Sequence, residues 1–277
     1  MSTLTIMGSA AAEGIPARFC GCDICKASRM LGGKNIRMTT SYALNERVRI
    51  DYGPDAWSEE LKLGIDPSIL AHLFYTHEHT DHLDVFPLDM RQQGFVHDCV
   101  VPLNIYGRAT VLDRIRRSIC PSAVKTLDLH LVRPFQPVSL PEEEMVFYPL
   151  PANHYHIPEE AVFYAVKHCG SWLMIANDTG IPPEAVWKWL EEVRPRFSVV
   201  IADCTIGVND NRDHHMGGRF ALEFHDRLVQ LGLVGKETRY IVNHFSHNGR
   251  SLHSDLEAYF NPHGIEVGYD GMTVEYP

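Results

Sequence analysis

A nine-residue stretch, residues 76–84, reads THEHTDHLD and is dense in side chains that bind metals. His77, His79, Asp81 and His82 form an H-x-H-x-D-H pattern directly after an apolar, strand-like segment. Imidazole nitrogen and carboxylate oxygen together suit Zn²⁺, Mn²⁺ or Fe²⁺. The alternative is a solvated turn in which an aspartate caps a helix. The density of ligands at this spacing favours a metal site.

The spacing of these four residues bears on the number of ions. Alternation in an extended segment puts His77, His79 and Asp81 on one side. His82 reaches a neighbouring position if a helix begins there. Four ligands within six residues can therefore serve two adjacent ions.

A second cluster, CGCDIC, places Cys20, Cys22 and Cys25 as C-x-C-x-x-C. Thiols this close in a reducing compartment indicate a metal, and three thiolates require a fourth ligand for tetrahedral Zn²⁺. The alternatives are three incidental thiols or a redox pair at Cys22 and Cys25. The other four cysteines are predicted to be buried thiols without a role: Cys99, Cys120, Cys169 and Cys204.

Short apolar runs separated by turn residues predict strands, and helical periodicity lies between them. A hairpin turn is expected at 169–171, and a further helix is expected to begin near Pro87. In the helix at 182–193, Val186, Trp189, Leu190 and Val193 are expected to share one face. Ser254 is expected to cap the last helix. Strands are predicted at 3–8, 47–53, 71–77, 144–150, 161–168, 172–178, 197–203 and 238–244, and helices at 182–193, 217–233 and 254–260.

Residues able to bind a metal follow these apolar strands repeatedly. They are His77, His154, Asp178, Asp203 and His244. A rigid scaffold presents a functional site on loops at its strand ends. Strands mixed with helices predict sheets packed on one another with helices outside.

The composition sets limits on the class of protein. The chain has 277 residues, of which 45% are hydrophobic, enough for one large core, and we predict a single domain over 1–277. It has no apolar run of membrane-spanning length, and no signal peptide is recognisable, so we expect a cytoplasmic protein. The net charge of −10 argues against nucleic-acid binding. A homodimer is compatible with the sequence.

The H-x-H-x-D-H pattern resembles the first metal motif of the metallo-β-lactamase superfamily, which implies an αββα four-layer sandwich, an α/β fold. The segments PANHY, ANDTG and VNHFSH resemble its later motifs. The resemblance implies one metal held by His77, His79, His154 and Asp178, and a second held by Asp81, His82, Asp178 and His244. His156 is the alternative to His154. Asp51 matches an aspartate that contacts a ligand histidine, although an ordinary turn residue is nearly as good an interpretation.

Further segments are similar to the branch that contains the phosphoribosyl 1,2-cyclic phosphate phosphodiesterase of the carbon–phosphorus lyase pathway. They are GSAAAEGIPARFCGCDICKASR, PLPANH, NDTG, DCT and GIEVGYDGM. This resemblance implies a structural zinc at Cys20, Cys22, Cys25 and His247, with the zinc-binding loop at 18–27. It also implies a catalytic histidine at His215, whereas His214 is interpreted as a surface residue.

The expected function is a metal-dependent hydrolase, a phosphodiesterase that opens a small cyclic phosphate such as phosphoribosyl 1,2-cyclic phosphate. Two divalent ions, Zn or Mn or Fe, about 3.5–4 Å apart would hold a bridging hydroxide, with Asp178 as the shared ligand. His215 would donate a proton to the leaving group. The partner is a small phosphorylated substrate, and Arg18 is interpreted as a solvated residue rather than a phosphate ligand.

Three other functions share part of this pattern. A tRNA 3′-processing endonuclease has the same metal motif, but it needs an RNA-gripping arm and a basic surface. An ester, lactone or thioester hydrolase of the superfamily fits the metal ligands equally well. A non-enzymatic accessory protein of cofactor biosynthesis is the last alternative, and the complete set of seven ligands argues against it.

Overall fold

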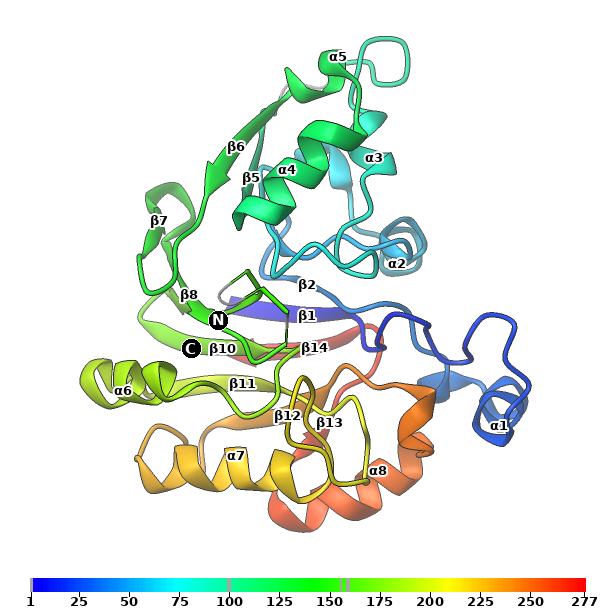
Figure 1. The fold of residues 1–277 in the computed structure, drawn as a ribbon, viewed down its shortest axis with the longest axis vertical. Helices are drawn as coiled ribbons and strands as arrows, with labels where there is room; N and C mark the ends of the chain where they lie inside the picture. The colour runs from blue at the N-terminus through cyan, green and yellow to red at the C-terminus, as the bar shows by residue number, and fades with distance from the viewer. Residues whose placement is uncertain (1, 99–100, 155, 158–159) are drawn as a thin grey trace.

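The computed structural model describes residues 2–98, 101–154, 156–157 and 160–277, and Cys99 lies outside them. Its centre is a pair of seven-stranded sheets (Figure 1). Helices cover the outer face of each sheet, so the layers run helix, sheet, sheet, helix. The α/β fold predicted as an αββα sandwich is confirmed.

The first sheet has the order β14-β1-β2-β3-β4-β5-β6. Its first three pairings, from β14 to β3, are antiparallel, and the pairings from β3 to β6 are parallel. The C-terminal strand therefore pairs with the N-terminal one. The bounds are β1 Ser2–Gly8, β2 Ser41–Ala43, β3 Val48–Ile50, β4 His72–Phe74, β5 Leu103–Gly107, β6 Leu127–Leu131 and β14 Met272–Tyr276.

The second sheet has the order β13-β12-β11-β10-β9-β8-β7. The strands from β10 to β13 run parallel, and those from β7 to β10 run antiparallel. The predicted hairpin joins β9 to β10 through Cys169 and Gly170, both at positive φ. The bounds are β7 Val138–Leu140, β8 Met145–Pro151, β9 Val162–His168, β10 Ser171–Ala176, β11 Phe197–Asp203, β12 Arg239–Asn243 and β13 Glu266–Val267.

Three apolar clusters hold the four layers together. One lies between the sheets, where Ile6 and Ile50 of the first sheet meet Phe147 and Val199 of the second. The other two lie between each sheet and its helices. The helices are α1 Asp23–Leu31, α2 Ala56–Leu63, α3 Phe86–Asp89, α4 Ala109–Ser118, α5 Pro121–Val124, α6 Glu184–Val193, α7 Arg219–Gln230 and α8 His253–Phe260.

All eight predicted strands are present, with β3 and β4 shorter than expected. The buried face of α6 was predicted wrongly in part, because Trp187 is buried there while Val193 is 41% exposed. The last helix begins at His253, so Ser254 is not its cap. No helix within the described residues is long and apolar enough to cross a membrane.

The prediction for the scattered cysteines also needs correction. Cys204 is buried as expected, but Cys120 is only half-buried and Cys169 is exposed. Cys169 sits in the tight β9–β10 turn, where a side chain projects into solvent. An apolar sequence context therefore did not determine burial.

Candidate dinuclear metal site

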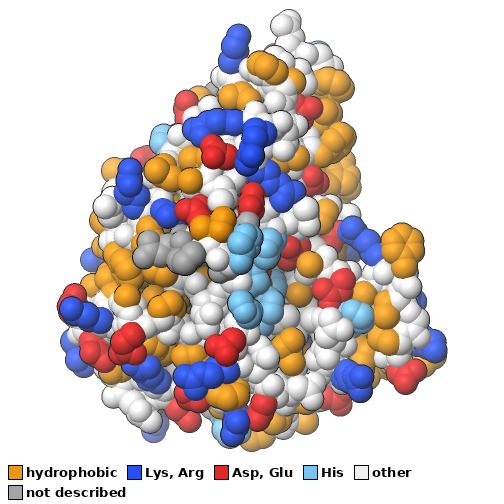
Figure 2. Space-filling model, viewed as in Figure 1, with side chains coloured by type: hydrophobic (Ala, Val, Ile, Leu, Met, Phe, Trp, Pro, Cys, Tyr) orange, Lys and Arg blue, Asp and Glu red, His pale blue; other side chains and the backbone are white. Residues whose placement is uncertain are grey.

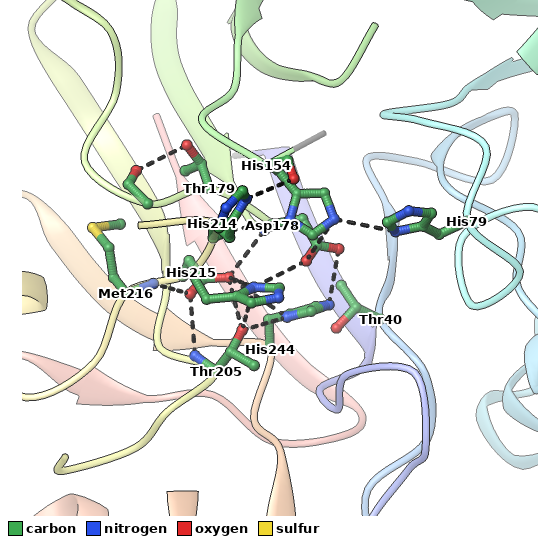
Figure 3. A network of polar contacts seen from close by, with 12 residues as sticks. Thr40, His79, His154, Asp178, Thr179, Thr205, His214, His215, Met216 and His244 are labelled. Carbon is green, nitrogen blue, oxygen red and sulfur yellow. Dashed lines mark hydrogen bonds and ion pairs between the residues drawn. The ribbon is translucent and has the colours of Figure 1, made fainter. Parts of the chain in front are cut away.

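Seven predicted ligands meet where strands of the two sheets end at one edge of the sandwich. Figure 3 labels four of them, His79, His154, Asp178 and His244. They follow β4, β8, β10 and β12 directly or within a few residues. The carboxyl ends of neighbouring parallel strands open onto the same side of a sheet, which brings loops distant in sequence together. The residues are His77, His79, Asp81, His82, His154, Asp178 and His244.

The first group is made of three histidines: His77, His79 and His154. The His154 Nε2 atom lies 3.1 Å from Nδ1 of His79 and 3.6 Å from Oδ1 of Asp178. Two nitrogens bound at zinc distances in a tetrahedron lie about 3.3 Å apart, so this spacing fits a shared ion. His156, the alternative ligand, is exposed.

The second group contains Asp81, His82, Asp178 and His244, all buried. The Nε2 atom of His82 lies 3.1 Å from Oδ2 of Asp81 and also contacts Oδ2 of Asp178 closely. The Nε2 atom of His244 is 3.1 Å from the same Asp178 oxygen. The extended alternation expected along 77–81 stops early, because a hydrogen-bonded turn takes the backbone N–H of His82 to the carbonyl of His79.

Asp178 lies between the two groups. Its Oδ1 faces His154, and its Oδ2 faces His82 and His244. The buried atoms His77 Nε2, His82 Nε2, His244 Nε2 and Asp178 Oδ2 have no hydrogen-bond partner among the described residues. Buried polar atoms without partners are costly, so a ligand that satisfies all four is expected. The donor set fits a pair of divalent ions.

The charges of the three-histidine group and of Asp178 agree with that fit, whereas the carboxylates around His82 and His244 outweigh burial and raise the pKa of these two rings. Burial lowers the pKa of His77, His79 and His154, so each ring keeps a neutral form with a lone pair. Burial opposes a charged Asp178, but the neighbouring His244, His154 and His82 hold the pKa of its carboxyl well below its usual range. Neutral imidazole and ionised carboxylate are the forms that bind metals.

The backbone at these strand ends is unusual. Asp51, Asp178 and His244 have φ values of 61°, 51° and 67°, in the left-handed region that few non-glycine residues adopt. Such conformations cluster where a structure holds functional groups in place. Gly180 lets the loop after β10 approach the 212–215 loop, since a Cβ there would lie 2.3 Å from the carbonyl oxygen of Arg212.

Asp51 contacts a ligand histidine, as the resemblance implies. Its Oδ2 lies 2.7 Å from Nδ1 of His82, and its Oδ1 accepts from the backbone N–H of Thr76 at 2.8 Å. The Thr76 hydroxyl donates to Asp51 and lies 3.0 Å from Nδ1 of His77. Partners of this kind set which ring nitrogen stays free for a metal.

Asp203 plays the corresponding part on the second sheet. It is fully buried and accepts hydrogen bonds from the backbone N–H groups of Asp178, Thr205 and Met216 at 3.0, 3.1 and 2.7 Å. One carboxylate thereby ties together two loops of the site, the one after β10 and the one after β11. Its place at the end of β11 was noted from the sequence, but this linking role was not.

His215 lies beside the two groups. Its Nδ1 is 3.2 Å from Oδ1 of Asp178 and 3.1 Å from the hydroxyl of Thr205. Burial opposes the charged ring, but the neighbouring carboxylates of Asp203 and Asp178 raise the pKa of His215 to about 9. A positively charged imidazole suits a proton donor or a partner for phosphate oxygens.

His214 is exposed, but it is not an isolated surface residue. Its Nδ1 lies 3.0 Å from the carbonyl oxygen of His154, and the Nδ1 of His154 lies 3.0 Å from the carbonyl oxygen of His214. This reciprocal pair fixes the His154 ring with its Nε2 toward Asp178. His214 is therefore a surface residue, as interpreted from the sequence, that also contacts the backbone of a predicted ligand.

Access to the site comes from one side. His79, His154 and His215 are half-buried, whereas the other five residues of the site are buried. Figure 2 shows histidine side chains gathered near the middle of this face of the molecule. A substrate therefore meets these three rings first.

The cysteine cluster lies on a separate part of the molecule, before and within α1, which projects to the side in Figure 1. The sulfur atoms of Cys20, Cys22 and Cys25 each lie 3.5 Å from Nδ1 of His247. Sulfur and nitrogen ligands of one tetrahedral zinc lie about 3.6 Å apart. Glu13 Oε1 lies 3.6 Å from the other ring nitrogen of His247.

The thiols differ in their surroundings. Cys22 is exposed, and its hydrogen bond with His247 lowers the pKa of its thiol to about 6, whereas burial raises the pKa of the Cys25 thiol to about 11. A thiolate is the metal-binding form, so Cys22 is the readiest ligand. Arg18 is mostly exposed and pairs with Asp55 at 3.2 Å, in agreement with its interpretation as a solvated residue.

Sequence reasoning missed Thr76, Thr205 and Glu13. Each lies next to a motif that was recognised: Thr76 precedes His77, and Thr205 ends the DCT segment. A hydroxyl directly after a strand end that carries ligands is a usable signal, because it can reach the Nδ1 atom of a neighbouring histidine. Glu13 gives no such signal, since only tertiary contact brings it to His247.

Fold and site together define a metal-dependent hydrolase of the metallo-β-lactamase type. The family model described as the beta-lactamase superfamily domain matches residues 46–245, and the chain belongs to this superfamily. None of the curated protein sequences compared with the chain gives a significant match.

Solved structures with the same fold include a diphosphatase from the PhnP family, which is 21% identical with a TM-score of 0.75 over 100% of this chain and 98% of that one. Zn²⁺-bound PqqB from Methylobacterium extorquens is 15% identical, with a TM-score of 0.71 over 99% and 100%. The short form of human tRNase Z is 15% identical, with a TM-score of 0.61 over 99% and 99%. At these identities the likeness concerns the fold.

Proposed function

We propose that the protein is a phosphodiesterase that opens a small cyclic phosphate, of the phosphoribosyl 1,2-cyclic phosphate type, with two divalent metal ions. The observation that carries this proposal is the position of His215 beside Asp178, the carboxylate that lies between the two ligand groups. A proton donor next to a two-metal site suits a phosphodiester with an alkoxide leaving group. The PhnP-family neighbour and the resemblance of the cysteine segment support the same branch.

Each residue has an assigned part in this reaction. His77, His79, His154 and Asp178 hold one ion, and Asp81, His82, Asp178 and His244 hold the other. When bound, the ions supply a nucleophile from water and neutralise charge on the phosphate. His215 donates a proton to the departing alkoxide oxygen, so the ring opens without releasing a strongly basic group.

The cysteine cluster has a structural role in this proposal. Cys20, Cys22, Cys25 and His247 bind one zinc with four protein ligands, which leaves no open position for chemistry. Glu13 orients the His247 ring from the far side. His247 lies three residues after His244, so this zinc steadies the loop that carries a catalytic ligand.

The test compares substrates on one metal-loaded preparation. Purified protein with Mn²⁺ or Zn²⁺ is assayed against a five-membered ribose cyclic phosphate, bis-p-nitrophenyl phosphate, a lactone, a thioester and a precursor tRNA. The proposal expects the highest kcat/KM with the cyclic phosphate. Preferential cleavage of the lactone, thioester or tRNA, or no turnover of any phosphodiester with two ions bound, would refute it.

A further inference from the structure

One buried hydroxyl contacts both the proposed proton donor and a proposed metal ligand. Thr205 Oγ1 lies 2.9 Å from Oδ2 of Asp203, 3.1 Å from Nδ1 of His215 and 2.8 Å from Nδ1 of His244. Dashed lines in Figure 3 connect Thr205 to both rings. Thr205 is only 4% exposed, so these side chains make up its polar surroundings.

With Asp203 ionised, one placement of the protons satisfies all three contacts of the Thr205 hydroxyl. A hydroxyl carries one proton and two lone pairs, and an ionised carboxylate only accepts. The Thr205 proton therefore goes to Asp203, which leaves both lone pairs for the two rings. His215 and His244 must each carry a proton on Nδ1 and donate it to Thr205.

This arrangement determines what the far nitrogens can do. His244 keeps a lone pair on Nε2, the atom 3.1 Å from Asp178. The Nε2 atom of His215 then remains available to exchange a proton with a substrate. Asp203 cannot replace the hydroxyl, because its Oδ2 lies 3.5 Å from each Nδ1, beyond a good hydrogen bond.

We infer that Thr205 is a positioning residue that holds a proton on Nδ1 of both His215 and His244, and so couples proton donation to metal binding. This inference rests on the proposed function for the roles of the two rings. The first sheet holds a matching pair, Thr76 and Asp51, whose hydroxyl and carboxylate contact the proposed ligands His77 and His82. That pair supplies a matched control.

The test uses Thr205→Val, which removes the hydroxyl, Thr205→Ser, which retains it, and Thr76→Val as the control. Long-range ¹H–¹⁵N NMR of histidine-labelled, metal-free protein reports which ring nitrogen carries the proton. Wild type and Thr205→Ser are expected to show Nδ1–H on His215 and His244. Thr205→Val should lose this preference on both rings, whereas Thr76→Val should leave it intact.

Metal and rate measurements complete the test. Loss of a partner to a ligand histidine typically weakens metal affinity about 10–100-fold. Chelator competition should show such a loss for one ion in Thr205→Val and in Thr76→Val. Thr205→Val should also lose about 10–100-fold in kcat at saturating metal, with most of it restored in Thr205→Ser.

Several outcomes would overturn the inference. A wild type in which Nδ1 of either ring carries no proton is sufficient by itself to overturn it, even if Thr205→Val does not fold. Unchanged tautomers and affinity in a folded Thr205→Val, or no recovery in Thr205→Ser, would also refute it. A wild type that binds two ions without cleaving phosphodiesters would instead contradict the proposed function and leave the tautomer result standing.

Discussion

The two candidate metal sites are built in opposite ways. The dinuclear site draws its ligands from residues 77–244, at strand ends of both sheets, and buries most of them. The cysteine site takes three ligands from six consecutive residues and leaves Cys22 exposed. The first requires the whole sandwich to form before its ligands meet, whereas the second needs one local turn and a single distant histidine.

This difference separates a site that is suited to catalysis from a site that is suited to stabilising the fold. Two partly open ligand groups sharing Asp178 can accept a substrate, but four protein ligands around one ion leave no free position. The sites are also connected. Phe245, between His244 and His247, exchanges backbone hydrogen bonds with Ser9 and Ala11 at 2.9 Å each, which joins the N-terminal segment to the loop that carries both histidines.

The largest effect is expected at Asp178, the residue shared by both ligand groups. Asp178→Ala should release the bound ions and lower kcat/KM by roughly 10³-fold or more, because metal ions contribute several kcal/mol of transition-state stabilisation. Metal analysis and phosphodiesterase assays measure this. One zinc per chain should persist at the cysteine site. Near-normal turnover, or loss of that zinc in a folded protein, would contradict the comparison.

His215→Ala separates the proton donor from the ligands. Turnover of an alkoxide-leaving cyclic phosphodiester should fall about 10²–10⁴-fold, while both catalytic ions stay bound. Bis-p-nitrophenyl phosphate should suffer less, because its leaving group needs little protonation. His263→Ala, an exposed histidine in the loop after α8, is the control. An equal loss of turnover with both substrates would contradict the proposed role of His215 as the proton donor.

His214→Ala is expected to have a smaller effect than His215→Ala. The substitution removes the imidazole that contacts the backbone carbonyl of His154. The affinity for metal should therefore fall, while the rate of the chemical step should change little. Chelator competition measures the loss of metal affinity, and kcat at saturating metal measures any loss in the chemical step.

Asp51→Asn tests the carboxylate that contacts the predicted ligand His82. The amide cannot replace the carboxylate that faces Nδ1 of His82 at 2.7 Å, so affinity for one ion should drop about 10–100-fold. Excess metal should restore most of the turnover, and the cysteine-site zinc should be unaffected. A rate loss that persists at saturating metal would assign Asp51 a part in the chemistry itself.

The smallest effect on chemistry is expected at the cysteine site. Cys22→Ser should remove one zinc and lower Tm by about 5–10 °C, because a bound ion stabilises only the folded state. Turnover by the remaining molecules should change by less than about tenfold, since no ligand of the dinuclear site is altered. A rate loss as large as that of Asp178→Ala would show that the two sites are not separate in function.

The sequence predicted both clusters because their ligands carry local signals. H-x-H-x-D-H and C-x-C-x-x-C are dense patterns within six residues, and their chemistry follows from side-chain type. The eight predicted strands followed from apolar runs, five of which lead into ligand-type residues. The helices were predicted less completely: α1, α2, α4 and α5 were not recognised. The buried face of α6 was partly misassigned, because packing against the sheet selects which apolar residues are covered.

By itself, the sequence determined which residues could bind metals and that apolar strands would present them. Only the tertiary structure decided that His154 rather than His156 joins the ligand groups, and that Thr205 contacts both His215 and His244. It also gave His214 a partner in His154. These choices depend on which loops meet at the edge of two packed sheets, and a distance between residues far apart in the chain is set by the packing of the sheets rather than by local spacing.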